Sequence, residues 1–177
     1  MSTTTIEQRI PTGTYVGDPI HSSFGFAVKH NGVSLFRGAF EEVEAKLEDG
    51  VLEGKVNVES VKTPIVDLKN HLLAPDFFDA ASHSTIEFRS SEIRAFEDGG
   101  VEVDGELTIR GTTLPVSAKG TYAQGVGMAG NDVLGLDLQA SIDRRDYGLS
   151  WQAPLPNGGD ALGWDVRLEV HLELQRA

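Results

Sequence analysis

A chain of 177 residues with 40% hydrophobic residues and a formal net charge of −12 is expected to fold as one domain over residues 1–177, with enough length to bury a sizeable core. The absence of cysteine excludes disulfides, thiolate metal sites and cysteine nucleophiles. The acidic balance disfavours nucleic acid and anionic membrane surfaces as partners, because both carry negative charge.

The first residues, Met1 to Val16, contain neither a basic start followed by an apolar core nor a long apolar run. This segment therefore predicts no signal peptide and no transmembrane helix. We expect a cytoplasmic protein without stable membrane insertion.

Apolar and polar residues alternate along most of the chain, which is typical of half-buried antiparallel strands. In Val101–Arg110 the odd positions hold valine, glycine, leucine and isoleucine, whereas the even positions hold charged or polar residues. Between Phe40 and Val43 the alternation slips by one residue, which predicts a β-bulge. The expected strands cover residues 23–30, 36–47, 51–61, 85–94, 101–110, 114–122, 133–142 and 164–174.

Short connections rich in Asp and Gly, such as Asp98-Gly99-Gly100, separate these segments and join neighbouring antiparallel strands. Strands of this kind form either a sandwich or a closed barrel. The short sequential connections favour an all-β, eight-stranded antiparallel up-and-down barrel.

Residues 64–81 interrupt the alternation. Ile65, Leu68 and Leu72 recur at helical spacing until Pro75 breaks the pattern, which predicts a short helical insertion. Asp76 and Asp79 are interpreted as caps of a helix N-terminus, with Asp76 near the start, rather than as an acid/base pair.

The glycine-rich segment Ala123 to Asp132 is expected to be a flexible loop. Its sequence GVGMAG, Gly125 to Gly130, matches the G-x-G-x-x-G pattern of dinucleotide sites. That pattern requires a following helix, whereas a strand-like run follows here, so a hairpin loop is predicted.

The histidines show no spacing that would place two of them on one face as metal ligands. His171 lies on the polar face of its strand and is expected to be solvated, and the other four are interpreted as structural. Catalytic sequence motifs are also absent, so the sequence predicts no catalytic residue, no metal and no cofactor. The five histidines are His21, His30, His71, His83 and His171.

Four stretches together resemble one family. They are Asp18-Pro19-Ile20-His21-Ser22 followed by Phe24, Phe26, Val28, His30, Gly38 and Phe40; His71-Leu72 and Asp76-Phe77-Phe78-Asp79 followed by Thr85 to Phe88; Gly105 to Gly111 followed by Pro115-Val116; and Asp143 to Leu149 followed by Trp151. These stretches are similar to the YceI-like proteins. Leu68-Lys69 and Ser84 depart from that family, which usually has Arg-Asp and often Pro at these positions.

The resemblance implies a lipocalin-like barrel that holds an apolar isoprenoid chain, such as a polyprenyl group or an isoprenoid quinone, and performs no catalysis. Our hypothesis is therefore a non-enzymatic protein that binds, carries or sequesters an isoprenoid lipid in the barrel lumen. Candidate lumen residues are chosen because they occupy apolar strand faces, and Phe77 and Phe78 are added from the helical insertion. The candidates are Phe24, Phe26, Val28, Phe40, Phe77, Phe78, Ile86, Phe88, Leu107, Ile109, Val116, Leu136 and Leu138.

Two alternatives stay open at this point. One is an enzyme, with or without a metal, built from His21, His30, His71 or His83 brought together by the fold. The other is a barrel filled by its own side chains that binds protein partners through its acidic surface. The sequence also allows a homodimer.

Overall fold

The structure is a computed structural model that describes residues 6–177. Its regular structure is mostly β-strand, with one α-helix, α1 (Val66–Leu73), and two short 3₁₀ helices, η1 (Val58–Ser60) and η2 (Arg144–Tyr147). All eight predicted strand segments contain observed strands. The strands are β1 (Glu7–Gln8), β2 (Thr14–Gly17), β3 (Ser23–His30), β4 (Ser34–Phe40), β5 (Val43–Glu48), β6 (Val51–Asn57), β7 (Val61–Lys62), β8 (Thr85–Phe96), β9 (Gly100–Ile109), β10 (Thr112–Val126), β11 (Asp132–Asp143) and β12 (Leu162–Arg176).

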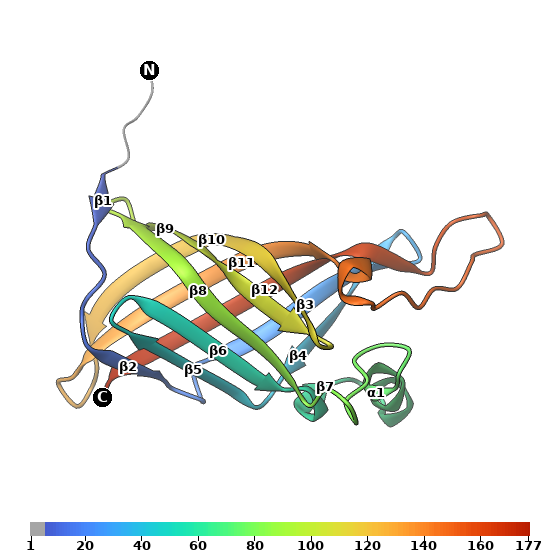
Figure 1. Cartoon of the computed structure of the whole chain (residues 1–177), viewed down its shortest axis with the longest axis horizontal. Helices are drawn as coiled ribbons and strands as arrows, with labels where there is room; N and C mark the ends of the chain where they lie inside the picture. The colour runs from blue at the N-terminus through green and yellow to red at the C-terminus, as the bar shows by residue number, and fades with distance from the viewer. Residues whose placement is uncertain (1–5) are drawn as a thin grey trace, which may run out of the picture.

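The strands pair antiparallel in chain order and close into an eight-stranded barrel (Figure 1). β2 and β3 act as one interrupted strand because both pair with β12. β4 and β5 act as the next strand, because β4 pairs with β3 and β5 pairs with β2. The ring continues through β6, β8, β9, β10 and β11 to β12, which returns to the first strand. The expected up-and-down barrel is confirmed.

At the phase slip where a bulge was predicted, the strand is interrupted: β4 ends at Phe40 and β5 begins at Val43, with Glu41 and Glu42 between them. The backbone N–H of Glu41 donates to the carbonyl of Ser60 at 3.1 Å, and that of Glu42 donates to Ser60 Oγ at 3.0 Å. Because these groups leave the strand ladder, β4 separates from β6 and pairs with β7 only at Ala39 and Phe40. Within the described chain, residues 34–38 of β4 therefore pair with β3 alone, and the sheet is interrupted beside them.

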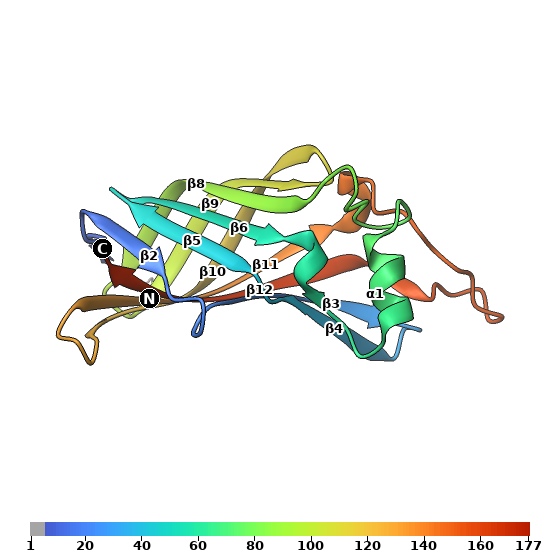
Figure 2. The same ribbon diagram turned by 90° about the horizontal axis from the view of Figure 1, so that it is seen from below.

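The helical insertion lies at this interruption. α1 and the turns that follow it lie at the end of the barrel where the β3–β4 hairpin also turns (Figure 2). Leu72 on the helix and Phe77 and Ala80 after it belong to the same buried cluster as Phe26 and Phe40. The insertion therefore completes the barrel core where strand pairing stops.

The interpretation of Asp76 and Asp79 as N-terminal caps is wrong. Both residues follow the C-terminal end of α1 at Leu73. Asp79 has a left-handed backbone (φ 52°), and its carbonyl accepts hydrogen bonds from the N–H groups of Ser82 and His83. Because Pro75 follows a helix here instead of opening one, the acids shape a turn that leads into β8.

The barrel interior divides into two buried clusters. One surrounds Phe26 and Phe40 at the α1 end. The other surrounds Tyr15, Val103 and Leu174 toward the opposite end, and each of these three is at most 1% exposed. The alternation of the sequence thus supplies one continuous apolar wall, and the end opposite α1 is filled by its own side chains.

The break between β2 and β3 is held by side chains from the segment Asp18–Ser22. Asp18 Oδ1 accepts the N–H of Ile20 at 2.8 Å, and Asp18 Oδ2 lies 2.8 Å from His21 Nδ1. The hydrogen bond with His21 is the main cause that holds the pKa of the Asp18 carboxyl below its ordinary value of 3.8. The same bond, aided by the charges of Asp18 and Glu173, raises the pKa of His21 above 6.5.

We expect an NMR titration to find the pKa of the His21 ring above 6.5, and Asp18→Asn to remove most of the shift, because the acceptor charge is lost. Because its pKa is raised in the folded protein, His21 contributes folding stability that is fully present below pH 6.5. That contribution is lost as the pH rises through the pKa of His21 in the folded protein. Because its pKa is lowered in the folded protein, Asp18 contributes folding stability that is fully present above pH 3.8. That contribution is lost as the pH falls through the pKa of Asp18 in the folded protein. Asp137→Asn, which removes the partner of His171, is the control and should leave His21 unchanged. A His21 pKa that stays the same in Asp18→Asn would contradict this assignment.

The connection between β10 and β11 is shorter than the expected loop over residues 123–132. β10 extends to Val126, and the turn is closed by a hydrogen bond from the Gly127 N–H to the Asn131 carbonyl at 2.8 Å. The GVGMAG segment therefore joins two antiparallel strands, as predicted, and no helix follows it.

Over residues 6–177, no helix has the length and apolar character needed to cross a membrane.

Candidate ligand-binding site

An apolar cavity of about 270 Å³ lies inside the barrel at the α1 end, and we call it the outer cavity. β3 and β4 contribute Phe26 and Phe36, the insertion contributes Leu68 and Phe78, and β12 contributes Val166. Enclosed apolar cavities of this size admit small ligands, since a cavity of about 150 Å³ already accepts a benzene ring. The outer cavity is thus a candidate binding site.

Aromatic rings form one wall of the outer cavity. Phe26 contacts Phe36, Phe40 and Phe78, with ring centroids 6.2, 5.9 and 6.3 Å away. Phe78 also meets Phe40 edge to face at 5.7 Å. These separations are typical of favourable aromatic pairs, so the insertion is attached to the strands through the wall of the cavity.

Gly38 on β4 makes this wall possible. A Cβ at position 38 would lie 2.3 Å from Cζ of Phe26, which is well inside van der Waals contact. The ring of Phe26 therefore lies across the Gly38 backbone, and only glycine leaves room for it.

A second, smaller apolar space of about 80 Å³ lies deeper in the barrel, and we call it the inner cavity. Phe24, Ile86 and Leu168 line both cavities, so the two spaces adjoin. Phe88 also lines the inner cavity, and its ring occupies the space that a Cβ at Gly105 would need. Val103, Leu138 and Leu172 also line it and belong to the buried cluster toward the far end, so the inner cavity adjoins the part of the barrel that is filled by side chains.

Polar groups are few and lie near the α1 end of the outer cavity. His30, His71 and Arg144 are among its lining residues. The ring of His71 meets Phe77 and Trp151 edge to face at 4.9 and 5.2 Å, and His71 Nε2 lies 3.5 Å from Asp76 Oδ2. An apolar cavity with a few polar groups is the usual composition of a small-molecule site.

Arg144 is a buried cation, 3% exposed, whose hydrogen bonds all go to backbone carbonyls. Nη1 donates to Leu149 and Trp151 at 2.6 and 2.8 Å, Nε donates to Gly163 at 2.8 Å, and Nη2 donates to Leu162 at 3.2 Å. Because Leu149, Trp151 and Leu162 line the outer cavity, Arg144 fixes one side of it. Burial lowers the pKa of the Arg144 guanidinium.

Most predicted lumen residues line one of the two cavities, although their role in binding stays a prediction. Phe24, Phe26, Val28, Phe40, Phe77, Phe78, Ile86 and Ile109 line the outer cavity. Phe88, Leu107, Val116 and Leu138 line the inner cavity, together with Phe24 and Ile86. Leu136 lines neither cavity and is buried in the cluster at the closed end.

Sequence reasoning did not choose several residues that line the outer cavity. Phe36, Ile142, Val166 and Leu168 lie on strands, where the apolar alternation could have identified them. Leu149 and Trp151 lie between η2 and β12, in a segment without periodicity. No local pattern could have placed these two beside the lumen.

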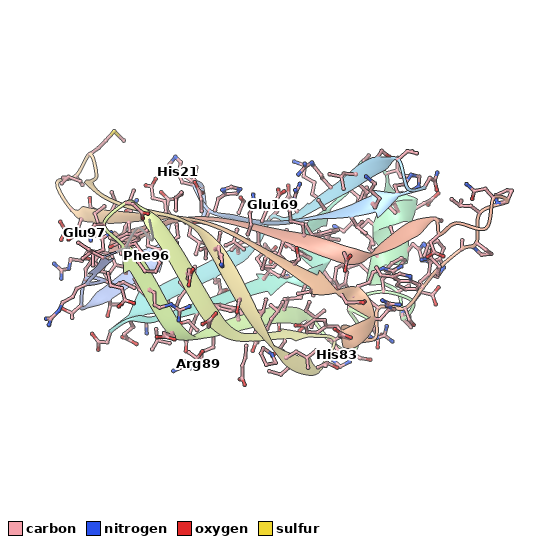
Figure 3. All side chains as sticks on the ribbon, turned by 90° about the horizontal axis from the view of Figure 1, so that it is seen from above. His21, His83, Arg89, Phe96, Glu97 and Glu169 are labelled. Atoms are coloured by element: carbon pink, nitrogen blue, oxygen red, sulfur yellow. The ribbon has the colours of Figure 1, made fainter. Side chains whose placement is uncertain are left out.

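The four histidines considered for catalysis do not meet. His30 and His71 line the outer cavity, whereas His83 lies against Gly111 and His21 bonds to Asp18. Figure 3 shows His21 and His83 on different sides of the barrel.

Among residues 6–177, one group of three side chains could hold a metal ion, namely Asp18, His21 and Glu173. His171 is exposed, as expected, and pairs with Asp137 at 2.6 Å.

Comparisons with known proteins agree with this architecture. A UPF0312 protein of Staphylococcus epidermidis is 30% identical over 166 residues, which cover 88% of this chain and 94% of that protein. The crystal structure of BcnA from Burkholderia cenocepacia has a TM-score of 0.74 at 22% identity and covers 89% of this chain and 98% of its own. A polyisoprenoid-binding domain from Saccharophagus degradans, implicated in plant cell wall breakdown, has a TM-score of 0.69 at 15% identity and covers 92% and 98%.

The model of the YceI-like domain matches residues 15–174, a range that runs from β2 into β12 and includes the residues that line both cavities. The chain belongs to the YceI-like domain family.

Proposed function

We propose that this protein binds an isoprenoid lipid in the lumen of its barrel and carries or sequesters it without catalysis. The observation that supports this most is the outer cavity, an apolar space walled by aromatic rings in a barrel whose opposite end is filled by side chains. The fold is shared with a domain that is named as polyisoprenoid-binding. A polyprenyl chain or an isoprenoid quinone is the ligand that we propose.

Burial of hydrocarbon supplies enough free energy for such binding. Each buried CH₂ contributes about 0.8 kcal/mol, so one five-carbon isoprene unit contributes roughly 4 kcal/mol. The outer and inner cavities, of about 270 and 80 Å³, accommodate a few units. A longer chain has to leave the barrel at the α1 end, because the other end is filled.

The polar groups of the outer cavity suit a small head group. The hydrogen bonds of Arg144 already go to four backbone carbonyls. The imidazoles of His30 and His71 also line the cavity and can donate a hydrogen bond to a quinone carbonyl. The proposal therefore places a head group near α1 and the isoprenoid tail deeper in the barrel.

The rival hypotheses are less well supported by the geometry. A barrel filled by its own side chains would not contain the outer cavity. An enzyme built from the four histidines would need them close together, whereas only His30 and His71 line the same space. The cytoplasmic location and the homodimer stay predictions.

Mass spectrometry of lipids extracted from gently purified protein tests the proposed function. We expect a prenyl compound to copurify, and a short-chain isoprenoid quinone to raise the melting temperature of delipidated protein, because the ligand binds only the folded state. A saturated fatty alcohol of similar length is the control for non-specific binding of apolar compounds and should give a smaller shift in melting temperature. Protein that carries no apolar ligand and shows no thermal shift with any prenyl compound would contradict the proposal.

A further inference from the structure

Two edges flank the outer cavity where the sheet is interrupted, and we call them the lips. Residues 33–36 of the β3–β4 hairpin form one lip, and residues 65–68 at the start of α1 form the other. Phe36 of β4 and Leu68 of α1 both line the cavity. Residues 34–38 of β4 have no strand partner on the side away from β3 within the described chain. The insertion that carries α1 therefore covers the cavity where the strand wall stops.

Large apolar side chains are exposed on both lips. Val33 and Leu35, at the β3–β4 turn and on β4, are 83% and 47% exposed. Ile65 and Val66, at the start of α1, are 62% and 68% exposed. Grouped exposed apolar residues beside a binding cavity mark an interaction surface more often than scattered ones.

Charge separates the lips from the rest of this acidic chain. No Asp or Glu occurs between Asp18 and Glu41, a segment that includes the whole β3–β4 hairpin with Lys29 and Arg37. Lys62 and Lys69 flank the start of α1, where the acid is Asp67. Arg37 pairs with Glu169 and Lys62 with Glu41, whereas Lys29 and Lys69 have no ion-pair partner among residues 6–177.

The opposite end of the barrel is acidic. Glu48 ends β5 and Asp49 follows it in the turn to β6, and Glu97 and Asp98 lie between β8 and β9. Figure 3 shows Glu97 at the end far from α1. A negatively charged surface repels these turns, whereas the β3–β4 hairpin carries no Asp or Glu that it would repel.

We propose that the two lips, Val33 with Leu35 and Ile65 with Val66, dock transiently on a lipid bilayer, so that an isoprenoid passes between membrane and cavity at the gap covered by α1. This inference rests on the proposed function, since an isoprenoid chain resides in bilayers. The apolar side chains enter the interface, Lys29 and Lys69 lie toward the headgroups, and the acidic end points to water. The contact is peripheral and needs no membrane-spanning segment.

Vesicle flotation tests the docking without any isoprenoid present. The probe is vesicles of phosphatidylcholine that contain a minority of phosphatidylglycerol. We expect the wild type to float with them, and Val33→Glu with Leu35→Glu, or Ile65→Glu with Val66→Glu, to lower vesicle affinity about ten-fold or more, because buried apolar area is replaced by charge. The matched control is Val126→Glu with Met128→Glu, which adds the same charge at two exposed apolar residues at the β10–β11 turn and should float as the wild type does.

Three results would overturn the inference. Lip variants that float as well as the wild type would do so, and so would a wild type that does not float at all. A wild type that forms a dimer without vesicles, and that lip variants convert to monomer, would assign the lips to a second copy of the chain. Lipid uptake from detergent solution is measured separately, so that failed docking with normal uptake refutes this inference alone, and failed uptake refutes the proposed function.

Discussion

Replacing Arg144 with alanine is expected to lower the free energy of unfolding by about 3 to 5 kcal/mol, because four backbone carbonyls lose hydrogen bonds to a charged donor. The guanidinium donates to the carbonyls of Leu149, Trp151, Leu162 and Gly163, and it stacks 4.2 Å over the ring of Trp164. Without it, these carbonyls lose a buried donor, and each unsatisfied group costs about 1 to 3 kcal/mol. Urea unfolding followed by circular dichroism measures the change.

The neighbouring Arg145 provides a matched control. Its guanidinium also lies over Trp164, at 4.7 Å, but its side chain is 53% exposed and pairs with Asp143 at 2.6 Å. Exposed ion pairs contribute about 0 to 1 kcal/mol, so Arg145→Ala should be mild. Equal destabilisation by the two substitutions would show that the buried carbonyl network does not hold this segment.

Replacing Val166 with tryptophan is expected to reduce isoprenoid binding at least ten-fold and to leave the barrel folded. Val166 is half-buried on β12, pairs with Val28 and Ile142, and all three line the outer cavity. An indole at this position fills space that a ligand would otherwise occupy. Displacing one isoprene unit removes roughly 4 kcal/mol of burial, and about 1.4 kcal/mol already corresponds to a ten-fold change in affinity.

The control for this variant lies on the outer face of the same strand. His171→Trp introduces the same side chain at an exposed position of β12 and should bind a short-chain isoprenoid quinone as the wild type does. Fluorescence titration measures affinity, and thermal unfolding checks that both variants fold. A folded Val166→Trp protein with unchanged affinity would show that the ligand lies outside the outer cavity.

Local sequence patterns predicted most of the fold. The alternation in Val101–Arg110 corresponds to β9, where the odd positions are buried. The phase slip between Phe40 and Val43 located the interruption at Glu41 and Glu42, because a slip of one residue moves every following side chain to the other face. These features depend on neighbours along the chain, so the sequence displays them directly.

The short strand β2 and the role of two acidic turn residues were harder to predict. β2 was not expected, since Thr14–Gly17 is too short for its alternation to stand out. Asp76 and Asp79 were assigned to the wrong end of a helix, because an Asp beside a proline suits a helix start and a turn after a helix equally well. Only the position of the helix end distinguishes these cases.

The sequence by itself determined antiparallel strands with one apolar face each, since period-two alternation is local and a strand must bury its apolar side, and its short connections favoured a barrel over a sandwich. The tertiary structure decided which part of that lumen stays hollow. Phe78 meets Phe26 and Phe40, and Arg144 ties Trp151 to the cavity, through contacts between distant parts of the chain. Cavity, lips and closed end depend on how side chains from different strands fill a shared volume, and no local pattern encodes that volume.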